Sequence, residues 1–260
     1  MTKQDDLGRT VTFYHPPTRV VSLVPSITEL LYDLGMKEQI VGKTKFCIHP
    51  KIKDDKATII GGTKNFDIQK IIELKPEIVI ANKEENTKDA IEELSKHCPV
   101  YVTDVRDIDD ALNMIENIGK ICDKYSKALE IVDQIENGFE ELSKEKIGSA
   151  IYLIWKQPYM TITKNTFINS MMELAGFENI FKHKEGNYPE ITEDEIRESG
   201  ADYILLSNEP YKFTEKHLPK FHTFFPNSKI LLVDGEMFSW YGSRMIKSIQ
   251  YFNQLKSMNK

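Results

Sequence analysis

Cys47 and His49 are the residues whose types and spacing most directly suggest chemistry, because a thiolate and an imidazole are both good zinc ligands. A zinc site held by protein needs three or four ligands. Cys98, Cys122 and the other histidines show no spacing that would complete one. We therefore predict that this segment is a loop with a buried cysteine and a polar histidine, and that the chain holds no metal through its own ligands.

Signatures of the common enzyme classes are missing from the sequence. It has no nucleophile elbow, no phosphate-cradling loop, no dinucleotide fingerprint and no zincin motif. The pair Gly61 and Gly62 alone predicts only a turn. The pattern therefore favours a binding protein over an enzyme.

Aromatic side chains are concentrated in two segments that follow predicted strands. Residues 155–159 begin with Trp155 and end with Tyr159, and residues 236–241 contain Glu236, Trp240 and Tyr241. Aromatic rings offer large flat contact areas, and a carboxylate can fix the orientation of a ligand. Both tryptophans of the chain lie in these two segments, which are therefore candidate binding loops for a large flat molecule.

A strand followed directly by a helix is predicted in the stretch of residues 19–31. Residues 20–24 are mostly β-branched and apolar, as in a buried strand, and Pro25 ends the strand by removing a ladder donor. Ser26 and Glu29 have the spacing of a capping box, and Gly35 is placed to end the helix. The turn at Pro25 is therefore expected at the carboxyl end of a strand, where open α/β sheets bind ligands.

The pattern helix, breaker, acidic residue and apolar strand occurs twice, at residues 68–81 and at residues 194–206, where Thr192 and Glu195 form a second predicted capping box. Strands are also predicted at 40–42, 150–154 and 229–233. Residues 7–14 alternate like a short edge strand leading into the first core strand. A helix is expected from Asn165 or Thr166 to Ala175, and a loop at 234–242 before a last helix that Ser243 could cap.

Between the two halves, the sequence predicts an amphipathic helix of roughly 20 residues, about 30 Å long. Its apolar positions are Leu129, Val132, Ile135, Phe139 and Leu142. We therefore predict an α/β protein with two βα lobes, bridged by one long rigid helix, with a ligand cleft between the lobes. The expected division is an N-terminal lobe at 1–122, the bridging helix at 123–147 and a C-terminal lobe at 148–260.

Composition narrows the class of partner. The chain has 260 residues, a formal net charge of -6 and a pI near 5.6, which argues against nucleic acid. No stretch reaches the roughly 18 apolar residues of a membrane span. The three cysteines imply no disulfide framework. Residues 1–9 lack the apolar core of a secretory signal, so we expect either a cytoplasmic chain or a mature form whose signal was replaced by a start Met.

Five segments of the chain form a combined pattern: residues 19–29, 47–50, 74–80, 166–169 and 174–180. Together they resemble the solute-binding proteins of class III ABC importers, and most closely their cobalamin-binding branch, the helical-backbone metal receptors. The resemblance covers nearly the whole chain. It implies lobes joined by a stiff helix, a cleft that closes little, a periplasmic or cell-envelope location, a monomer without an intrinsic cofactor, and an ABC permease as partner.

In the cobalamin branch, aromatic and small residues from strand-end loops of both lobes hold the corrin. The matching positions here are Pro25, the Cys47 to Pro50 loop, Trp155 and residues 236–240. With the aromatic segments above, this gives eight expected ligand contacts: Pro25, Cys47, His49, Trp155, Tyr159, Glu236, Trp240 and Tyr241.

Two features depart from that branch. Where the cobalamin proteins have a further tryptophan, this chain has Thr63. Where they have the two glutamates that dock on the transporter, this chain has Gln69 and Asp194. Our leading hypothesis is a corrinoid receptor that serves an ABC importer. The alternatives are a receptor of the same fold for haem, a ferric siderophore or a metal, motivated by Cys47 and His49, and an intracellular corrinoid carrier or cofactor-processing protein.

Overall fold

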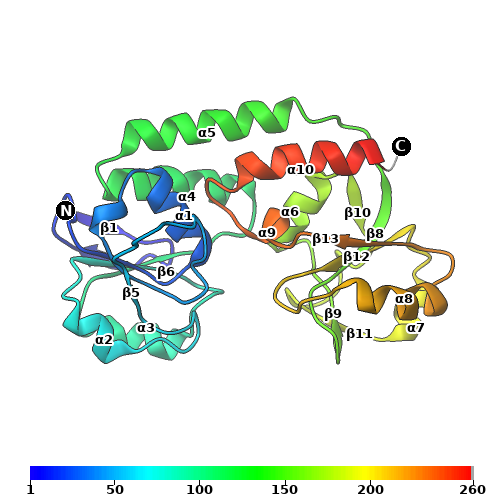
Figure 1. Ribbon diagram of the computed structural model, residues 1–260, viewed down its shortest axis with the longest axis horizontal. Coiled ribbons are helices and arrows are strands. Elements are labelled where there is room, and N and C mark those ends of the chain that lie inside the picture. Colours follow the sequence, from blue (N-terminus) through cyan, green and yellow to red (C-terminus); the bar gives the residue numbers. More distant parts are fainter. Residues whose placement is uncertain (259–260) are drawn as a thin grey trace. The chain divides into compact units, whose positions relative to one another are not determined.

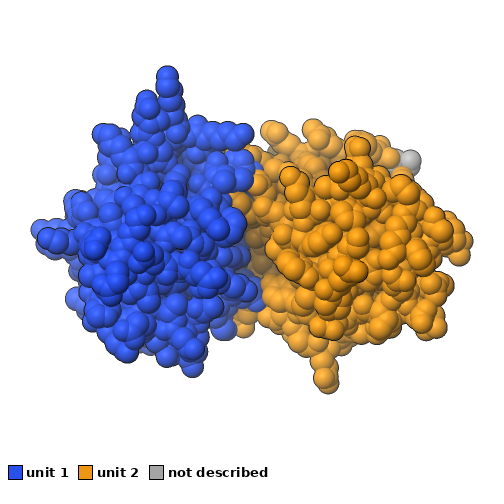
Figure 2. All heavy atoms as spheres, turned by 60° about the horizontal axis from the view of Figure 1, so that its bottom comes forward, with its two compact units in different colours: residues 1–105, 109–135, 241–244 blue, residues 106–108, 136–240, 245–260 orange. Residues whose placement is uncertain are grey.

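The computed structural model describes residues 1–258, and the chain divides into two compact units, coloured blue and orange in Figure 2. Each unit has its own parallel sheet with helices, so the predicted α/β class with two lobes is confirmed. Within residues 1–258, no helix has both the length and the apolar content of a membrane span. Unit 1 comprises Met1–Val105, Asp109–Ile135 and Tyr241–Arg244, and unit 2 comprises Arg106–Ile108, Glu136–Trp240 and the chain from Met245.

Unit 1 is built on a five-stranded parallel sheet in the order β5-β4-β3-β6-β7. Helices α1 and α4 lie on one face of it, and α2 and α3 lie on the other (Figure 1). Coverage on both faces explains why β3 and β6 are buried along their whole length. The strands are β3 (Val20–Ser22), β4 (Ile40–Lys43), β5 (Thr58–Ile59), β6 (Ile78–Asn82) and β7 (Val100–Thr103); the helices are α1 (Pro25–Asp33), η1 (Lys37–Gln39), α2 (Ile68–Glu73), α3 (Lys88–Leu94) and α4 (Ile108–Ile121).

Unit 2 is built on a four-stranded parallel sheet in the order β10-β8-β12-β13. Helices α7 and α8 pack on one face, where Ile196 and Phe221 join the apolar core, and α6, α9 and α10 lie on the other (Figure 1). The strands are β8 (Gly148–Leu153), β10 (Phe177–Asn179), β12 (Tyr203–Ser207) and β13 (Lys229–Val233), with a small sheet of β9 (Tyr159–Met160) and β11 (Glu190–Ile191); the helices are α6 (Phe167–Leu174), α7 (Glu193–Glu198), η2 (Glu215–His217), α8 (Leu218–Phe224), α9 (Glu236–Ser239) and α10 (Met245–Met258).

The N-terminal segment differs from its prediction. Instead of forming an edge of the core sheet, β2 (Thr10–Thr12) pairs antiparallel with β1 (Thr2–Gln4) in a separate two-stranded sheet. An alternation of polar and apolar residues identifies a strand that buries every second side chain, and in β2 the buried side chain is that of Val11. Alternation alone does not identify the partner strand.

The start of α1 also differs from its prediction. Val24 is the N-cap and makes no side-chain capping bond, and Pro25 is the first helical residue, where its missing N–H costs nothing. The predicted Ser26–Glu29 capping box is therefore wrong. The end of α1 is as predicted, because Gly35 has φ +81° and its N–H donates to the Tyr32 carbonyl at 2.9 Å.

Local capping signals in unit 2 are confirmed. In α7, the Glu195 N–H donates to Thr192 Oγ1 at 3.1 Å, and the Thr192 N–H donates to Glu195 Oε2 at 2.8 Å, which is a complete capping box. Thr166 caps α6 by accepting a bond from the Asn169 N–H at 3.3 Å. Ser243 is different, because its buried hydroxyl has no hydrogen-bond partner among residues 1–258 and so does not cap α10.

Helix α5 (Tyr125–Glu140) is shorter than the predicted helix. It has 16 residues, about 24 Å at 1.5 Å per residue, and ends before Leu142, while α4 has already ended at Ile121. The predicted length of about 20 residues was therefore wrong. The boundary between the two units falls within α5, after Ile135. The bridging role of this helix and the division at 122 and 147 stay predictions.

Segment 234–242 was predicted to be a loop, but it contains the short helix α9. After α9, Tyr241–Arg244 belongs to unit 1 before the chain enters α10 of unit 2. This segment packs on α1, where Gly242 approaches Leu30 with φ +94°, a conformation that favours glycine. The chain thus returns to the N-terminal unit for four residues, Tyr241–Arg244.

A buried ion pair holds this returning segment. Arg244 donates from Nε to Glu29 Oε2 at 2.7 Å and from Nη2 to Oε1 at 2.9 Å. The two side chains are only 4% and 2% exposed. A bidentate pair of this kind satisfies both charges where water is excluded. Glu29 therefore forms a long-range ion pair with Arg244 and does not cap α1.

Replacing Arg244 by Met should destabilise unit 1 by about 3 to 5 kcal/mol, because the buried carboxylate of Glu29 would lose the guanidinium group that pairs with it. Urea unfolding followed by circular dichroism measures the change. The double variant Glu29→Met with Arg244→Met should regain most of the loss. Lys127→Gln is the control, since it removes only an exposed pair with Glu130 and should cost less than about 1 kcal/mol. A loss below about 1 kcal/mol for Arg244→Met would show that the pair is not needed.

Candidate functional site

The carboxyl edge of the sheet in unit 1 gathers loops from several strands. Leu23 is the first residue after β3, and Asn82 is the last residue of β6. The side chain of Asn86 ties these loops together, donating to the Thr63 carbonyl at 2.8 Å and to the Leu23 carbonyl at 3.4 Å. Asn82 closes its own turn by accepting from the Glu84 N–H at 2.9 Å. Pro25 therefore begins α1 beside an edge that hydrogen bonds hold in place.

Cys47 lies in the loop after β4 with its sulfur turned to the interior. Its Sγ is 3.1 Å from Thr28 Oγ1 and 3.2 Å from Thr44 Oγ1. Burial raises the pKa of the thiol, although the hydrogen bonds from the two threonines lower it in part. The expectation of a buried cysteine is confirmed, and the side chain of His49 is half-buried. Among residues 1–258, no three His, Cys, Asp or Glu side chains gather as metal ligands would.

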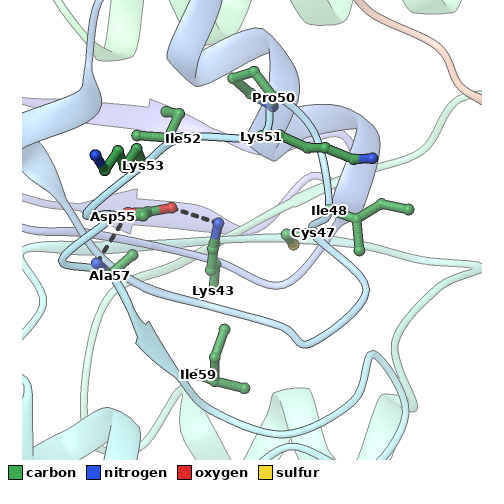
Figure 3. A pocket seen from close by; sticks show the side chains of 10 residues that line it. All are labelled: Lys43, Cys47, Ile48, Pro50, Lys51, Ile52, Lys53, Asp55, Ala57 and Ile59. Atoms are coloured by element: carbon green, nitrogen blue, oxygen red, sulfur yellow. Dashed lines mark hydrogen bonds and ion pairs between the residues drawn. The ribbon is translucent and has the colours of Figure 1, made fainter.

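The same loop is fastened to the sheet by Asp55. Its Oδ2 accepts bonds from Lys43 Nζ and from the Tyr32 hydroxyl, each at 2.6 Å. Burial alone would raise the pKa of Asp55, but the bonds from Lys43 and Tyr32 lower it below its usual value. This network forms one side of a pocket of about 590 Å³ that lies wholly in unit 1 (Figure 3). Sequence reasoning missed Lys43 and Asp55, because only the fold brings them together.

In unit 2, Trp155 follows β8 and remains 40% exposed. Its ring packs edge to face against the ring of Tyr211, with 5.7 Å between the ring centroids. Its backbone carbonyl accepts a hydrogen bond from the Met160 N–H at 3.2 Å. Tyr159, at the start of β9, is buried in the apolar core against Phe221. Trp155 is thus a large aromatic side chain that is held in place and open to solvent on one side.

The segment after β13 is more buried than a surface loop. Trp240 is almost completely covered, and its Nε1 donates to Glu209 Oε2 at 3.1 Å. Glu236 is the half-buried first residue of α9. Tyr241 is also buried and belongs to unit 1. Sequence reasoning missed Glu209, although its place just after the predicted strand β12 was a usable signal.

Gln69 and Asp194 occupy matching places in the two units. Each is the second residue of a short helix, α2 and α7, and each is exposed. Asp194 pairs with Arg197 at 2.6 Å, which lies on the same helix. As surface residues at helix starts, both are accessible to another protein. Their role in docking stays a prediction, as do the eight expected ligand contacts.

Glu85 is a further candidate that the sequence did not suggest. It lies in the loop after β6, beside the Asn82 and Asn86 turn described above. Glu85 is half-buried. Its partial burial raises the pKa of its carboxyl group, and nearby Lys64 offsets only part of this. An ionisable group with a perturbed pKa at the carboxyl edge of a parallel sheet is a candidate ligand contact.

The chain consists of two α/β units, each with a parallel sheet, and open α/β sheets bind ligands beyond the carboxyl ends of their strands. The chain belongs to the periplasmic binding protein family, whose family model matches residues 20–224. It is a solute-binding protein of the ABC-importer type, not an enzyme. Proteins of this kind carry no intrinsic cofactor.

Relatives support this assignment. The chain is 27% identical over 220 residues to an uncharacterised ABC transporter substrate-binding lipoprotein of Bacillus subtilis, covering 80% of this chain and 69% of that protein. It is 23% identical over 251 residues to the vitamin B12-binding protein of Pectobacterium carotovorum, covering 91% and 87%.

Solved structures show the same fold. The vitamin B12-binding protein BtuF of Vibrio cholerae has a TM-score of 0.80 at 17% identity and covers 94% of this chain and 98% of that one. The haem-binding protein RhuT of Roseiflexus sp. RS-1 has a TM-score of 0.79 at 16% identity and covers 93% and 99%. At these identities the likeness concerns the fold alone.

The titration of Glu85 should appear in the stability of the protein. Its pKa in the folded state is raised above the ordinary value of a glutamate. The folded chain therefore binds more protons than the unfolded chain at pH values between the two pKa values, and stability falls as pH rises through this range. Glu85→Gln should therefore stabilise the protein at pH 7, and the gain should vanish at acidic pH, where wild-type Glu85 is also neutral.

Thermal unfolding at several pH values measures this effect. Glu141→Gln is the control, because Glu141 is an exposed carboxylate and its substitution should leave the pH dependence unchanged. Equal pH profiles for wild type and Glu85→Gln would contradict the burial of a charged carboxyl group.

Proposed function

We propose that this protein is a receptor for a corrinoid and delivers it to an ABC importer. The observation that carries the proposal is Trp155, a large aromatic side chain that stays 40% exposed at the end of a core strand and is held by Tyr211. An exposed ring in a fixed position provides contact area at little cost in conformational entropy. Several relatives of this chain are vitamin B12-binding proteins, such as that of Pectobacterium carotovorum.

The corrin is a large ring with apolar faces and amide groups on its edge. Aromatic side chains suit the faces, and carboxylates suit the amide donors. In this proposal both units contribute contacts, and α5 acts as a stiff connection that limits their motion. The proposed contacts are Pro25, Cys47, His49, Trp155, Tyr159, Glu236, Trp240 and Tyr241.

Haem is the second candidate ligand. It is also a flat metal chelate, and the haem-binding protein of Roseiflexus sp. RS-1 shares the fold of this chain. Haem differs from a corrinoid in carrying two carboxylates and no amide edge. A direct comparison of the two ligands therefore decides between the candidates.

Cyanocobalamin should bind wild-type protein with a saturable heat in isothermal titration calorimetry. Trp155→Ala should weaken binding by about 10- to 100-fold, the range expected for losing an aromatic anchor. Tyr14→Ala is the control, because Tyr14 is also an exposed aromatic residue, at 69% against 40% for Trp155, and lies outside the proposed contacts. The corrinoid proposal fails if wild-type protein gives no heat at tens of micromolar concentration.

Docking on the importer is proposed to involve Gln69 and Asp194. Asp194→Ala should reduce the stimulation of ATP hydrolysis by the reconstituted importer several-fold, because a charge that meets a cationic surface is lost. Gln69→Glu should increase the stimulation by adding the complementary charge in unit 1. Glu92→Ala, on the exposed face of α3, serves as the control. Unchanged stimulation in both variants would remove these residues from the docking surface.

A further inference from the structure

The pocket in unit 1 has a composition that restricts the solute. Its wall is mainly apolar, Lys43 and Asp55 form an ion pair in it, and the side chains of Lys51 and Lys53 extend to opposite sides of that pair (Figure 3). Its volume of about 590 Å³ is in the range of small-molecule sites. The lining residues that matter for the ligand are Lys43, Ile48, Lys51, Lys53, Asp55 and Ile59.

Apolar side chains of this pocket are left in contact with water. Ile48 is 51% exposed and Ile59 is 44% exposed, although both are large aliphatic residues. Covering such surface gains roughly 25 cal/mol per Å². A ligand with an apolar body would therefore be stabilised between them.

The charges of the pocket do not balance. The single acidic residue, Asp55, already accepts bonds from Lys43 and Tyr32. Lys51 and Lys53 are exposed and form no ion pair within the described part of the chain. Three lysines against one aspartate leave the pocket cationic, in a chain whose formal net charge is -6. This separation of charge favours an anionic group on the ligand.

We infer that this pocket is the subsite for an anionic group, a carboxylate or a phosphodiester, that is attached to an apolar part of the solute. The inference rests on the proposed function and adds to it the kind of group that unit 1 recognises. Lys43 offers a buried cation that Asp55 holds in position, and Lys51 and Lys53 supply exposed cations from the loop. In this arrangement Cys47 and Pro50 line the pocket, and Cys47 does not bind a metal.

Three ligands distinguish a phosphodiester from a carboxylate as the group that the pocket binds. Cyanocobalamin carries a phosphodiester, dicyanocobinamide has the same ring system without it, and haemin carries two carboxylates. Each is titrated by calorimetry into wild type, into the double variant Lys51→Gln with Lys53→Gln, and into Lys56→Gln. Lys56 lies in the same loop, does not line the pocket and has a side chain 87% exposed, so it is the matched control.

The double variant should weaken cyanocobalamin or haemin about tenfold, because two ion pairs are lost. Binding of dicyanocobinamide should stay unchanged, and Lys56→Gln should match wild type with every probe. The loss should shrink at high salt, which screens the lysines in wild type as well. The probe that responds identifies the group as a phosphodiester or a carboxylate.

The failures of the two proposals can be told apart. If the corrinoids bind but neither they nor haemin depend on the two lysines, the subsite is overturned and the corrinoid function stands. If only haemin binds, and binds through the lysines, the subsite stands and the corrinoid function is overturned. If no probe saturates wild type, both proposals are overturned.

Discussion

The buried pair of Glu29 and Arg244 is the constraint on which the arrangement of unit 1 depends. Neither charge is tolerated alone in a site that water does not reach, so α1 and the returning segment must meet in one geometry. This requirement keeps Tyr241–Arg244 with the N-terminal unit although the elements before and after it belong to unit 2. The segment that follows α9 in the sequence is thereby fixed against α1 by Glu29.

The binding loops depend on a second kind of constraint, the satisfaction of buried polar groups. Asn86 joins the ends of two loops in unit 1, and Asp55 fastens the long loop after β4 to α1 and to the sheet. In unit 2, Glu209 holds the indole of Trp240. Such bonds keep the loops in one conformation before a ligand arrives, which reduces the ordering that binding would otherwise require.

The two units offer different chemistry at their strand ends. Unit 1 presents lysines and exposed isoleucines around a pocket, whereas unit 2 presents the exposed ring of Trp155. The family assignment limits the chain to solute binding, and the chemistry of these loops is what can narrow the solute further.

Features set by neighbouring residues were predictable from the sequence. The core strands follow from β-branched runs, Gly35 ends α1, and Thr192 with Glu195 caps α7. The strand-end position of Trp155 was also correct. These features could be predicted because each is decided by dihedral preferences or by hydrogen bonds within a few residues.

Tertiary structure decided the rest. Glu29 has the spacing of a capping residue, yet its partner lies 215 positions away, and a buried bidentate pair outweighs a cap. Helix α5 stops at Glu140 although its apolar spacing continues to Leu142. Cys47 turns inward to two hydroxyls, and Lys43 meets Asp55 across a loop. The type of a residue determines which kinds of interaction its side chain can make. Only the fold determines which possible partner lies within interaction distance.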